Sequence, residues 1–339
     1  MRSPSRRLRT PALAVLALTA ATTLGGCGAL SDDSGSGGDD GKVSVAAGFY
    51  PLQYVAERVG GDLVDVEAVS APGKDPHDAE LTVQETATLS AADLVVLLEG
   101  FQPAVDEATE QNATGEVLDA ADVVDLLPVE EDHDHDHGSG SDSGHSDHGE
   151  GEDHGEGEDH ADHDHGDEDP HFWQDPLRMA DLGDAVAESL SEVDPDNAAA
   201  YEEGAARLRA DLEALDEEFR EGLASCDLDT VVVSHDAFGY LEDRYDLHFD
   251  PVAGLSPDAE PTPADLSALQ RLIRAEGITT VFSERLAPRQ FTAALADDLG
   301  LETSVLDPLE GLSDETADED YLSLMRANLA ALQEANSCR

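Results

Sequence analysis

Short apolar segments alternate with amphipathic ones along most of the chain. Residues 94–98 (LVVLL) form a continuous apolar run, which is typical of a strand buried on both faces of a parallel sheet. Two further strands are predicted at 43–47 and 63–69, and helices are predicted at 49–59 and 82–91. Because strands and helices follow one another in turn, this half of the chain is predicted to form an α/β lobe.

The second half of the chain repeats the same alternation. Strands are predicted at 230–233, 248–252, 279–282 and 303–306, with helices at 264–275, 288–299 and 320–334. In the first half the pattern continues through 117–127 before it ends, and we count four strand–helix units in each half. This count predicts two lobes, each built on a four-stranded parallel sheet flanked by helices. Ligands of such lobes bind beyond the carboxyl ends of the strands, so residues that follow strands are the first candidates for a site.

A long helix is predicted between the two halves, after a shorter one at 176–193. Asp194 as N-cap and Pro195 at the first helical position mark its start. Its large apolar residues recur every three, four or seven positions up to residue 223, which places them on one helix face. From 195 to 224 the helix would be about 45 Å long. We therefore predict that residues 194–225 form a rigid helix joining an N-terminal lobe (43–193) to a C-terminal lobe (226–339).

The first residues have the pattern of an export signal. Four arginines precede an apolar run at 12–24 that is too short to span a membrane comfortably, which predicts a signal peptide at 1–26. The run ends in Leu-Gly-Gly-Cys27, which resembles a bacterial lipobox, whose cysteine carries lipid after cleavage. An ordinary signal with an incidental cysteine is the alternative. Residues 27–42 are then a lipidated cysteine and a flexible tether, and the protein is expected to be extracytoplasmic and anchored to the bacterial cell membrane.

The chain is strongly acidic, with 77 Asp and Glu against 18 Lys and Arg and a formal net charge of −59. This charge excludes non-specific nucleic-acid binding, because a phosphate backbone would be repelled. Residues 130–168 contain no aromatic residue, no aliphatic residue larger than alanine and no basic residue besides histidine, which predicts a disordered loop.

Nine of the 13 histidines lie in this acidic loop, several of them alternating with aspartate. Such alternation offers loose chelates for metal, at His133, His135, His137, His163 and His165. The alternative is that the loop is only a solvated run of charge.

Three cysteines are present, and one of them is assigned to the lipid. In an oxidising compartment we expect the other two, Cys226 and Cys338, to form a disulfide. Two free buried thiols are the alternative.

The four histidines outside the loop are the sharper evidence for a site. His77, His171 and His235 lie just after predicted strands or in the loops beside them, whereas His248 lies inside a strand pattern and is interpreted as an ordinary surface or core residue. Three imidazoles that converge at strand ends, with one position left for a carboxylate or water, make a tetrahedral zinc site.

Two carboxylates end predicted strands of the second lobe. Asp307 follows the last strand and is the candidate fourth ligand. Glu284 follows the strand at 279–282 and is predicted either to bind the metal or to accept a hydrogen bond that fixes the tautomer of an imidazole.

Several motifs occur in one order along the chain: PHDAE at 76–80, DPHFWQDP at 169–176, HDAFGYL at 235–241, VFSE at 281–284 and LDPL at 306–309. Together with the lipobox and the histidine-rich insertion, they resemble the zinc/manganese solute-binding lipoproteins of bacterial ABC importers, most closely the ZnuA-type zinc-binding members. The resemblance covers nearly all of residues 43–339. It implies two lobes joined by a rigid helix, with metal at the lobe interface bound by His77, His171 and His235, and with Asp307 where some members supply a carboxylate.

The resemblance also implies partners, namely an ABC permease with its cytoplasmic ATPase, and a monomeric binding protein. Manganese-type members place a carboxylate where this chain has His235, and three imidazoles favour Zn²⁺ over Mn²⁺. A manganese-binding member and a stand-alone cell-surface zinc buffer are the alternatives. A zinc hydrolase has no support, because the chain has no HExxH motif and no general base beside an open metal position, so no enzyme is predicted.

Overall fold

The computed structural model describes residues 41–71, 73–129, 168–257 and 259–339. The predicted signal peptide, Cys27, most of the tether and all nine histidines of the acidic loop, including the five predicted chelating ones, lie outside these residues. Within the described residues, no helix has both the length and the apolar character that a membrane span needs.

The first lobe is a four-stranded parallel sheet in the order β2-β1-β3-β4. Its strands are β1 Val43–Ala47, β2 Val64–Ala68, β3 Leu94–Leu97 and β4 Glu116–Asp119, and its helices are α1 Tyr50–Gly60, α2 Val83–Ala91 and α3 Pro103–Asn112. All four residues of β3 are buried, as its unbroken apolar run predicted. A capping box between Thr82 and Glu85 starts α2.

The second lobe has the same strand order, β10-β9-β7-β8, again all parallel. Its strands are β7 Thr230–Val233, β8 His248–Pro251, β9 Thr280–Ser283 and β10 Glu302–Val305, and its helices are α6 Gly239–Tyr245, α7 Pro263–Glu276, α8 Gln290–Leu299 and α9 Tyr321–Ala335. The predicted fold class, two lobes of four-stranded parallel sheet flanked by helices, is confirmed. Helices α3 and α6 were not predicted from the sequence.

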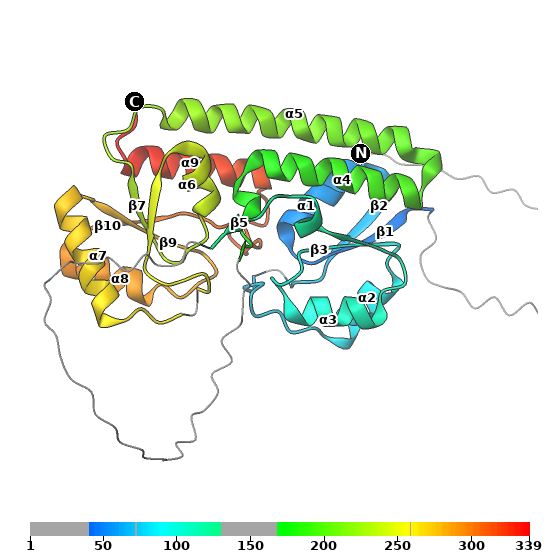
Figure 1. The fold of residues 1–339 in the computed structure, drawn as a ribbon, viewed down its shortest axis with the longest axis horizontal. Helices are drawn as coiled ribbons and strands as arrows, with labels where there is room; N and C mark the ends of the chain where they lie inside the picture. Colours follow the sequence, from blue (N-terminus) through cyan, green and yellow to red (C-terminus); the bar gives the residue numbers. More distant parts are fainter. Residues whose placement is uncertain (1–40, 72, 130–167, 258) are drawn as a thin grey trace, which may run out of the picture. The chain divides into compact units, whose positions relative to one another are not determined.

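Two long antiparallel helices lie across the sheets, α4 Pro176–Val193 and α5 Ala198–Leu223. Figure 1 shows α5 running along both lobes, with α4 beside it over the first lobe and α9 beside it over the second. The 26 residues of α5 are about 39 Å long. The predicted start was wrong by three residues. Residues 195–197 form a 3₁₀ turn, and the Asp194 carboxylate binds Asn197 Nδ2 and Tyr201 Oη instead of capping backbone amides.

One apolar core runs through both lobes beneath α5. It joins Val45 of the first sheet and Val233 of the second to Leu212 on the buried face of α5. A smaller cluster fills the opposite face of each sheet, under α2 and α3 in the first lobe and under α7 and α8 in the second. Each sheet is therefore covered on both faces, and the described residues form a single compact unit.

The predicted disulfide is confirmed, since Cys226 is bonded to Cys338. It ties the segment after α5 to the segment after α9. Backbone hydrogen bonds run beside it, from Arg339 N to Ser225 O at 2.9 Å and from Asp227 N to Asn336 O at 3.0 Å. The C-terminus is therefore fastened to the start of the second lobe.

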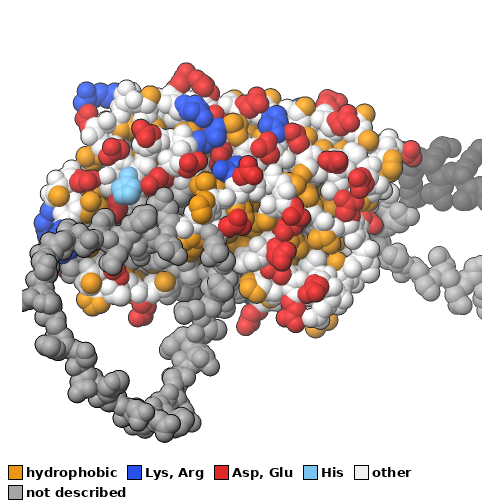
Figure 2. Space-filling view, viewed as in Figure 1, with side chains coloured by type: hydrophobic (Ala, Val, Ile, Leu, Met, Phe, Trp, Pro, Cys, Tyr) orange, Lys and Arg blue, Asp and Glu red, His pale blue; other side chains and the backbone are white. Residues whose placement is uncertain are grey.

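Acidic side chains are scattered over the face of the molecule drawn in Figure 2. Most carboxylates of the described residues are on the surface, as their solvation requires. The buried ones are Asp169, Asp175, Asp216, Glu284, Asp307 and Glu310. A buried carboxylate needs a partner, so this small set directs attention to the interior between the sheets.

Candidate metal site

The structure brings His77, His171 and His235 together, although they are far apart in sequence. His77 lies in the loop between β2 and α2, His235 follows β7, and His171 follows the two-residue strand β6 Glu168–Asp169. The ring centroids are 5.5 to 6.0 Å apart. The side chains of His171 and His235 are fully buried, and that of His77 is 4% exposed.

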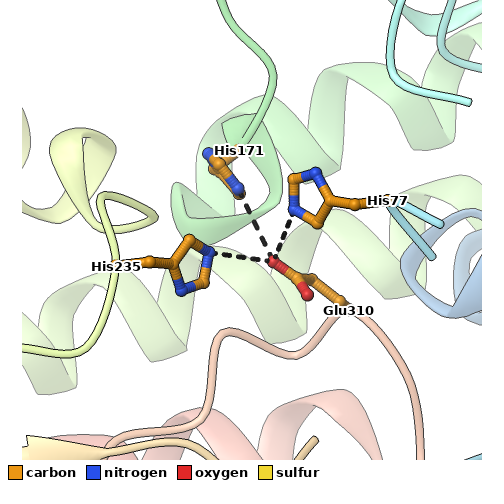
Figure 3. A group of neighbouring side chains, drawn as sticks. All are labelled: His77, His171, His235 and Glu310. Atoms are coloured by element: carbon orange, nitrogen blue, oxygen red, sulfur yellow. Dashed lines mark hydrogen bonds and ion pairs between the residues drawn. The ribbon is translucent and has the colours of Figure 1, made fainter. Parts of the chain in front are cut away.

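The fourth group at this position is Glu310. Its Oε1 lies 3.3 Å from His77 Nε2, 3.6 Å from His171 Nε2 and 3.4 Å from His235 Nε2 (Figure 3). In a tetrahedral zinc site with bonds of about 2.1 Å, neighbouring ligand atoms are about 3.4 Å apart. The four ligand atoms all lie within 4.8 Å of one another. The carboxylate and the three imidazoles therefore have nearly the spacing that a tetrahedral ion requires.

Asp307, the residue predicted for the fourth position, does not point into this group. Its Oδ1 accepts a hydrogen bond from Leu309 N at 2.9 Å, and its Oδ2 accepts one from Arg285 Nε at 3.1 Å. The carboxylate closes the turn that follows β10. The structure thus places Glu310, three residues later, where the sequence analysis placed Asp307.

The turn that presents Glu310 is held from two sides. Asn328 of α9 bonds both the N–H and the carbonyl of Asp307. The carbonyl of Pro308 accepts hydrogen bonds from Trp173 Nε1 at 2.7 Å and from Gln174 Nε2 at 2.5 Å. Leu309 has a φ of 61°, in the left-handed region that is uncommon for a leucine. These contacts direct the Glu310 side chain toward the histidines.

Two of the imidazoles are held by carboxylates on their outer nitrogens. Asp169 Oδ1 lies 2.7 Å from His171 Nδ1 and also accepts from the His171 backbone N–H. Glu284 Oε1 lies 2.6 Å from His235 Nδ1, and it also accepts from the Ser234 hydroxyl. A proton on Nδ1 in each ring leaves Nε2 to face the centre of the group. Glu284 was predicted either to bind the metal or to fix the tautomer of an imidazole. The structure shows its carboxylate in contact with the imidazole of His235.

The charges of this group are strongly interdependent. Burial disfavours the charged form of His171, but the Asp169 carboxylate outweighs it and raises the pKa of His171 to about 9. Burial acts in the same direction on His235, yet Glu284 and Glu310 raise its pKa well above the usual value. Burial would raise the pKa of Glu310, but contacts with the three histidines hold it well below its usual range. The buried carboxylates therefore favour the protonated forms of His171 and His235 when no metal is bound.

We expect metal binding to release protons. A histidine with a raised pKa stabilises the fold fully below about pH 6.5, and that contribution is lost as the pH rises toward 9. The free energy of unfolding of metal-free protein should therefore fall over this range. With zinc bound the imidazoles are already neutral, so the free energy of unfolding should fall less over this range.

The protons released on zinc binding can be measured directly. Calorimetric titration of zinc at pH 7.5 in two buffers of different ionisation enthalpy gives their number. Equal heats in both buffers would contradict the expectation.

Glu310 and Asp169 belong to the group but were not predicted as members of it. Asp169 stands two residues before His171 in the DPH motif, and at this spacing its carboxylate can bond the His171 ring. Glu310 lies in the same loop as the predicted Asp307, so the loop was identified but not the residue. His248 is exposed on β8 beside Glu242, outside the group, as its position inside a strand pattern suggested.

A family model described as ZnuA, zinc-uptake complex component A periplasmic, matches residues 45–335. The zinc-binding lipoprotein AdcA of Streptococcus pneumoniae is 32% identical over 301 residues, which are 87% of this chain and 56% of that protein. The chain thus spans little more than half the length of that relative. The high-affinity zinc uptake system protein ZnuA of Bacillus subtilis is 30% identical over 316 residues, covering 91% of this chain and 92% of that protein.

Solved structures show the same fold. The Zn(II)-bound ZnuA-like domain of Streptococcus pneumoniae AdcA superposes with a TM-score of 0.68 at 28% identity. The match covers 87% of this chain and 99% of that domain.

Proposed function

Because the chain belongs to the family of periplasmic zinc-uptake components ZnuA, we propose that it is the extracytoplasmic zinc-binding component of a metal ABC importer. The observation that carries the proposal is the group of three imidazoles and one carboxylate between the two sheets. Zn²⁺ is the cargo, bound by His77, His171, His235 and Glu310. Its charge replaces the protons that the metal-free group would hold.

The donor set favours zinc over manganese. Three nitrogen ligands and one carboxylate suit the borderline-soft Zn²⁺ ion, whereas Mn²⁺ favours oxygen-rich, octahedral sites. The outer nitrogens of His171 and His235 are already bound by carboxylates, so these rings have little freedom to turn away for a larger coordination shell. Relatives whose names include zinc support the same choice.

In this proposal the protein is exported, anchored by lipid on Cys27, and delivers zinc as a monomer to a membrane permease driven by a cytoplasmic ATPase. Solute binding for uptake is not an enzymatic activity, so no catalysis is assigned. A stand-alone zinc buffer is the second candidate function, favoured only by the nine histidines of the acidic segment. A strain that lacks the protein separates the two. An importer component is needed for growth when zinc is chelated, whereas a buffer is needed mainly when zinc is in excess.

We expect the ordered site and the acidic segment to bind zinc differently. The composition of the acidic segment predicts disorder, and a disordered segment that loses conformational entropy around an ion binds it more weakly than ligands already in place. Because β6 begins at Glu168, a deletion should end at residue 167. Protein lacking residues 132–167 should bind one zinc tightly, and the full chain should bind several more weakly, with the weak sites lost as the pH falls through about 6.5.

Titration calorimetry on both forms at pH 7.5 and 5.5 measures this difference. The control is His171→Ala in the shortened protein, which should abolish tight binding. Equal stoichiometry with and without residues 132–167 would show that the segment is only a charged linker. Tight binding that survived His171→Ala would contradict the proposed site.

A further inference from the structure

Helix α6 follows His235 in the chain and contacts the turn that carries His171. Its first residue, Gly239, follows His235 by four positions, and the intervening Ala237 and Phe238 are buried. A hydrogen bond from Ala237 N to His235 O at 3.1 Å keeps this connection short. The position of α6 therefore determines where His235 lies.

The N-terminal end of α6 contacts the residue that holds His171. Tyr240 is 1% exposed, and its hydroxyl donates to the Asp169 carbonyl at 2.7 Å. The same hydroxyl accepts from Leu127 N at 2.8 Å, so it binds both strands of the small β5–β6 ribbon, in which β5 is Leu127–Pro128. Gly239 packs closely here, because a Cβ at this position would lie 2.9 Å from Asp169 Oδ2.

The other end of α6 is fastened beyond His171. Arg244 Nη1 lies 3.2 Å from Oδ2 of Asp175, the residue that caps α4. Arg244 Nε donates to Asp216 of α5 at 2.6 Å. Asp216 also accepts hydrogen bonds from Tyr245 Oη and Arg220 Nε, so the guanidinium is held in a network of partly buried charges.

We propose that Tyr240 and Arg244 are positioning residues that fix the His171 turn relative to the His235 loop, so that these two imidazoles form a preformed half of the metal site. Tyr240 acts on Asp169 before His171, and Arg244 acts on Asp175 after it. The turn is thus held on both sides by the helix that follows the His235 loop. The inference rests on the proposed zinc binding, and it adds residues whose hydrogen bonds reach Asp169 and Asp175, on either side of His171, and not the histidine itself.

The expected effect is on metal affinity more than on folding. Partners that orient metal ligands from outside typically change affinity by about 10–100-fold when removed. Tyr240→Phe removes two hydrogen bonds and leaves the ring in place under the Arg178 guanidinium, 4.9 Å from its centroid. We expect zinc release from full-length Tyr240→Phe protein, loaded with one equivalent of zinc, to be about tenfold faster than from wild type. Stopped-flow transfer to a chromophoric chelator measures the rate.

Tyr201→Phe is the matched control. Tyr201 is also fully buried, and its hydroxyl donates to a carboxylate, Asp194, at the far end of α5 from the disulfide. This variant should lose a comparable amount of thermal stability and release zinc at the wild-type rate. Arg244→Met should behave like Tyr240→Phe, and Arg244→Lys, which keeps one cation beside Asp216, should partly restore the rate. Release within twofold of wild type for both Tyr240→Phe and Arg244→Met would overturn the proposal.

A second measurement does not depend on zinc. In metal-free protein, amide hydrogen exchange over residues 168–175 should be faster in Tyr240→Phe than in wild type and unchanged in Tyr201→Phe. If wild-type protein failed to bind zinc tightly, the proposed function would fail while the exchange experiment still tested the link between α6 and the His171 turn. Unchanged exchange in Tyr240→Phe would overturn that link whatever the metal result.

Discussion

Replacing Glu310 by glutamine should weaken zinc binding about 100-fold or more, whereas replacing Asp307 by asparagine should change it far less. Glu310 contributes the negative oxygen that faces all three imidazoles. Removing it takes away a ligand and leaves the charge of the ion less compensated in a buried site. Asparagine at 307 keeps an oxygen that can accept from Leu309 N, so the turn that presents Glu310 should persist. Competition with a chelator of known affinity measures both changes in protein lacking residues 132–167.

His235→Ala provides the reference for complete loss of the site in the same protein. Trp173 gives an independent signal, because its ring centroid lies 5.2 Å from that of His171 and its indole N–H binds the Pro308 carbonyl. Its fluorescence should change on zinc binding in wild type and in Asp307→Asn. If Asp307→Asn lost as much affinity as Glu310→Gln, the assignment of the fourth ligand would be wrong.

Removing the disulfide should lower the free energy of unfolding by about 4–5 kcal/mol. The two cysteines are 112 positions apart, and a crosslink that closes so long a loop removes much of the entropy of the unfolded chain. The double variant Cys226→Ala/Cys338→Ala should show the loss in urea unfolding of metal-free protein. Zinc affinity should stay at the wild-type value, since neither cysteine contacts the metal group.

Reduced wild-type protein is the control for this double variant. It should unfold with the same lowered stability, because it lacks the same crosslink while keeping both side chains. If the oxidised wild type and the double variant unfolded at the same urea concentration, the crosslink would contribute nothing to stability. Two alkylated thiols in native protein, detected by intact mass without reductant, would show that it does not form.

Strands buried on both faces could be predicted from the sequence, because a continuous apolar run is visible without any knowledge of tertiary contacts. The boundaries of β7 and α4 were predicted to the residue, and β3 to within one residue. Helix α3 was missed because only Val105 and Thr109 are buried on it, too few to give a helical period. Helix α6 was missed because seven residues are barely two turns, and its position depends on tertiary contacts of Tyr240 and Arg244.

The three histidines could be predicted because strand ends of parallel sheets converge, whatever the details of the loops. The fourth group could not, because it depends on the shape of one turn. Asp307 is nearer to the strand, but hydrogen bonds to Leu309 and Arg285 occupy its carboxylate, and the left-handed backbone of Leu309 turns Glu310 inward. Those bonds involve Arg285 of another loop, and Asn328 and Trp173 fix the same turn from distant elements.

The apolar core that continues beneath α5 limits how the protein can be divided or recombined. A cut between residues 224 and 225 would leave the buried face of α5 without the residues of α9 and α6 that pack against it. Each fragment would expose a broad apolar surface, and neither should be soluble alone. A chimera that takes its second lobe from a relative should therefore also take the C-terminal half of α5 from that relative, so that the boundary between parents falls within a helix instead of in the loop after it.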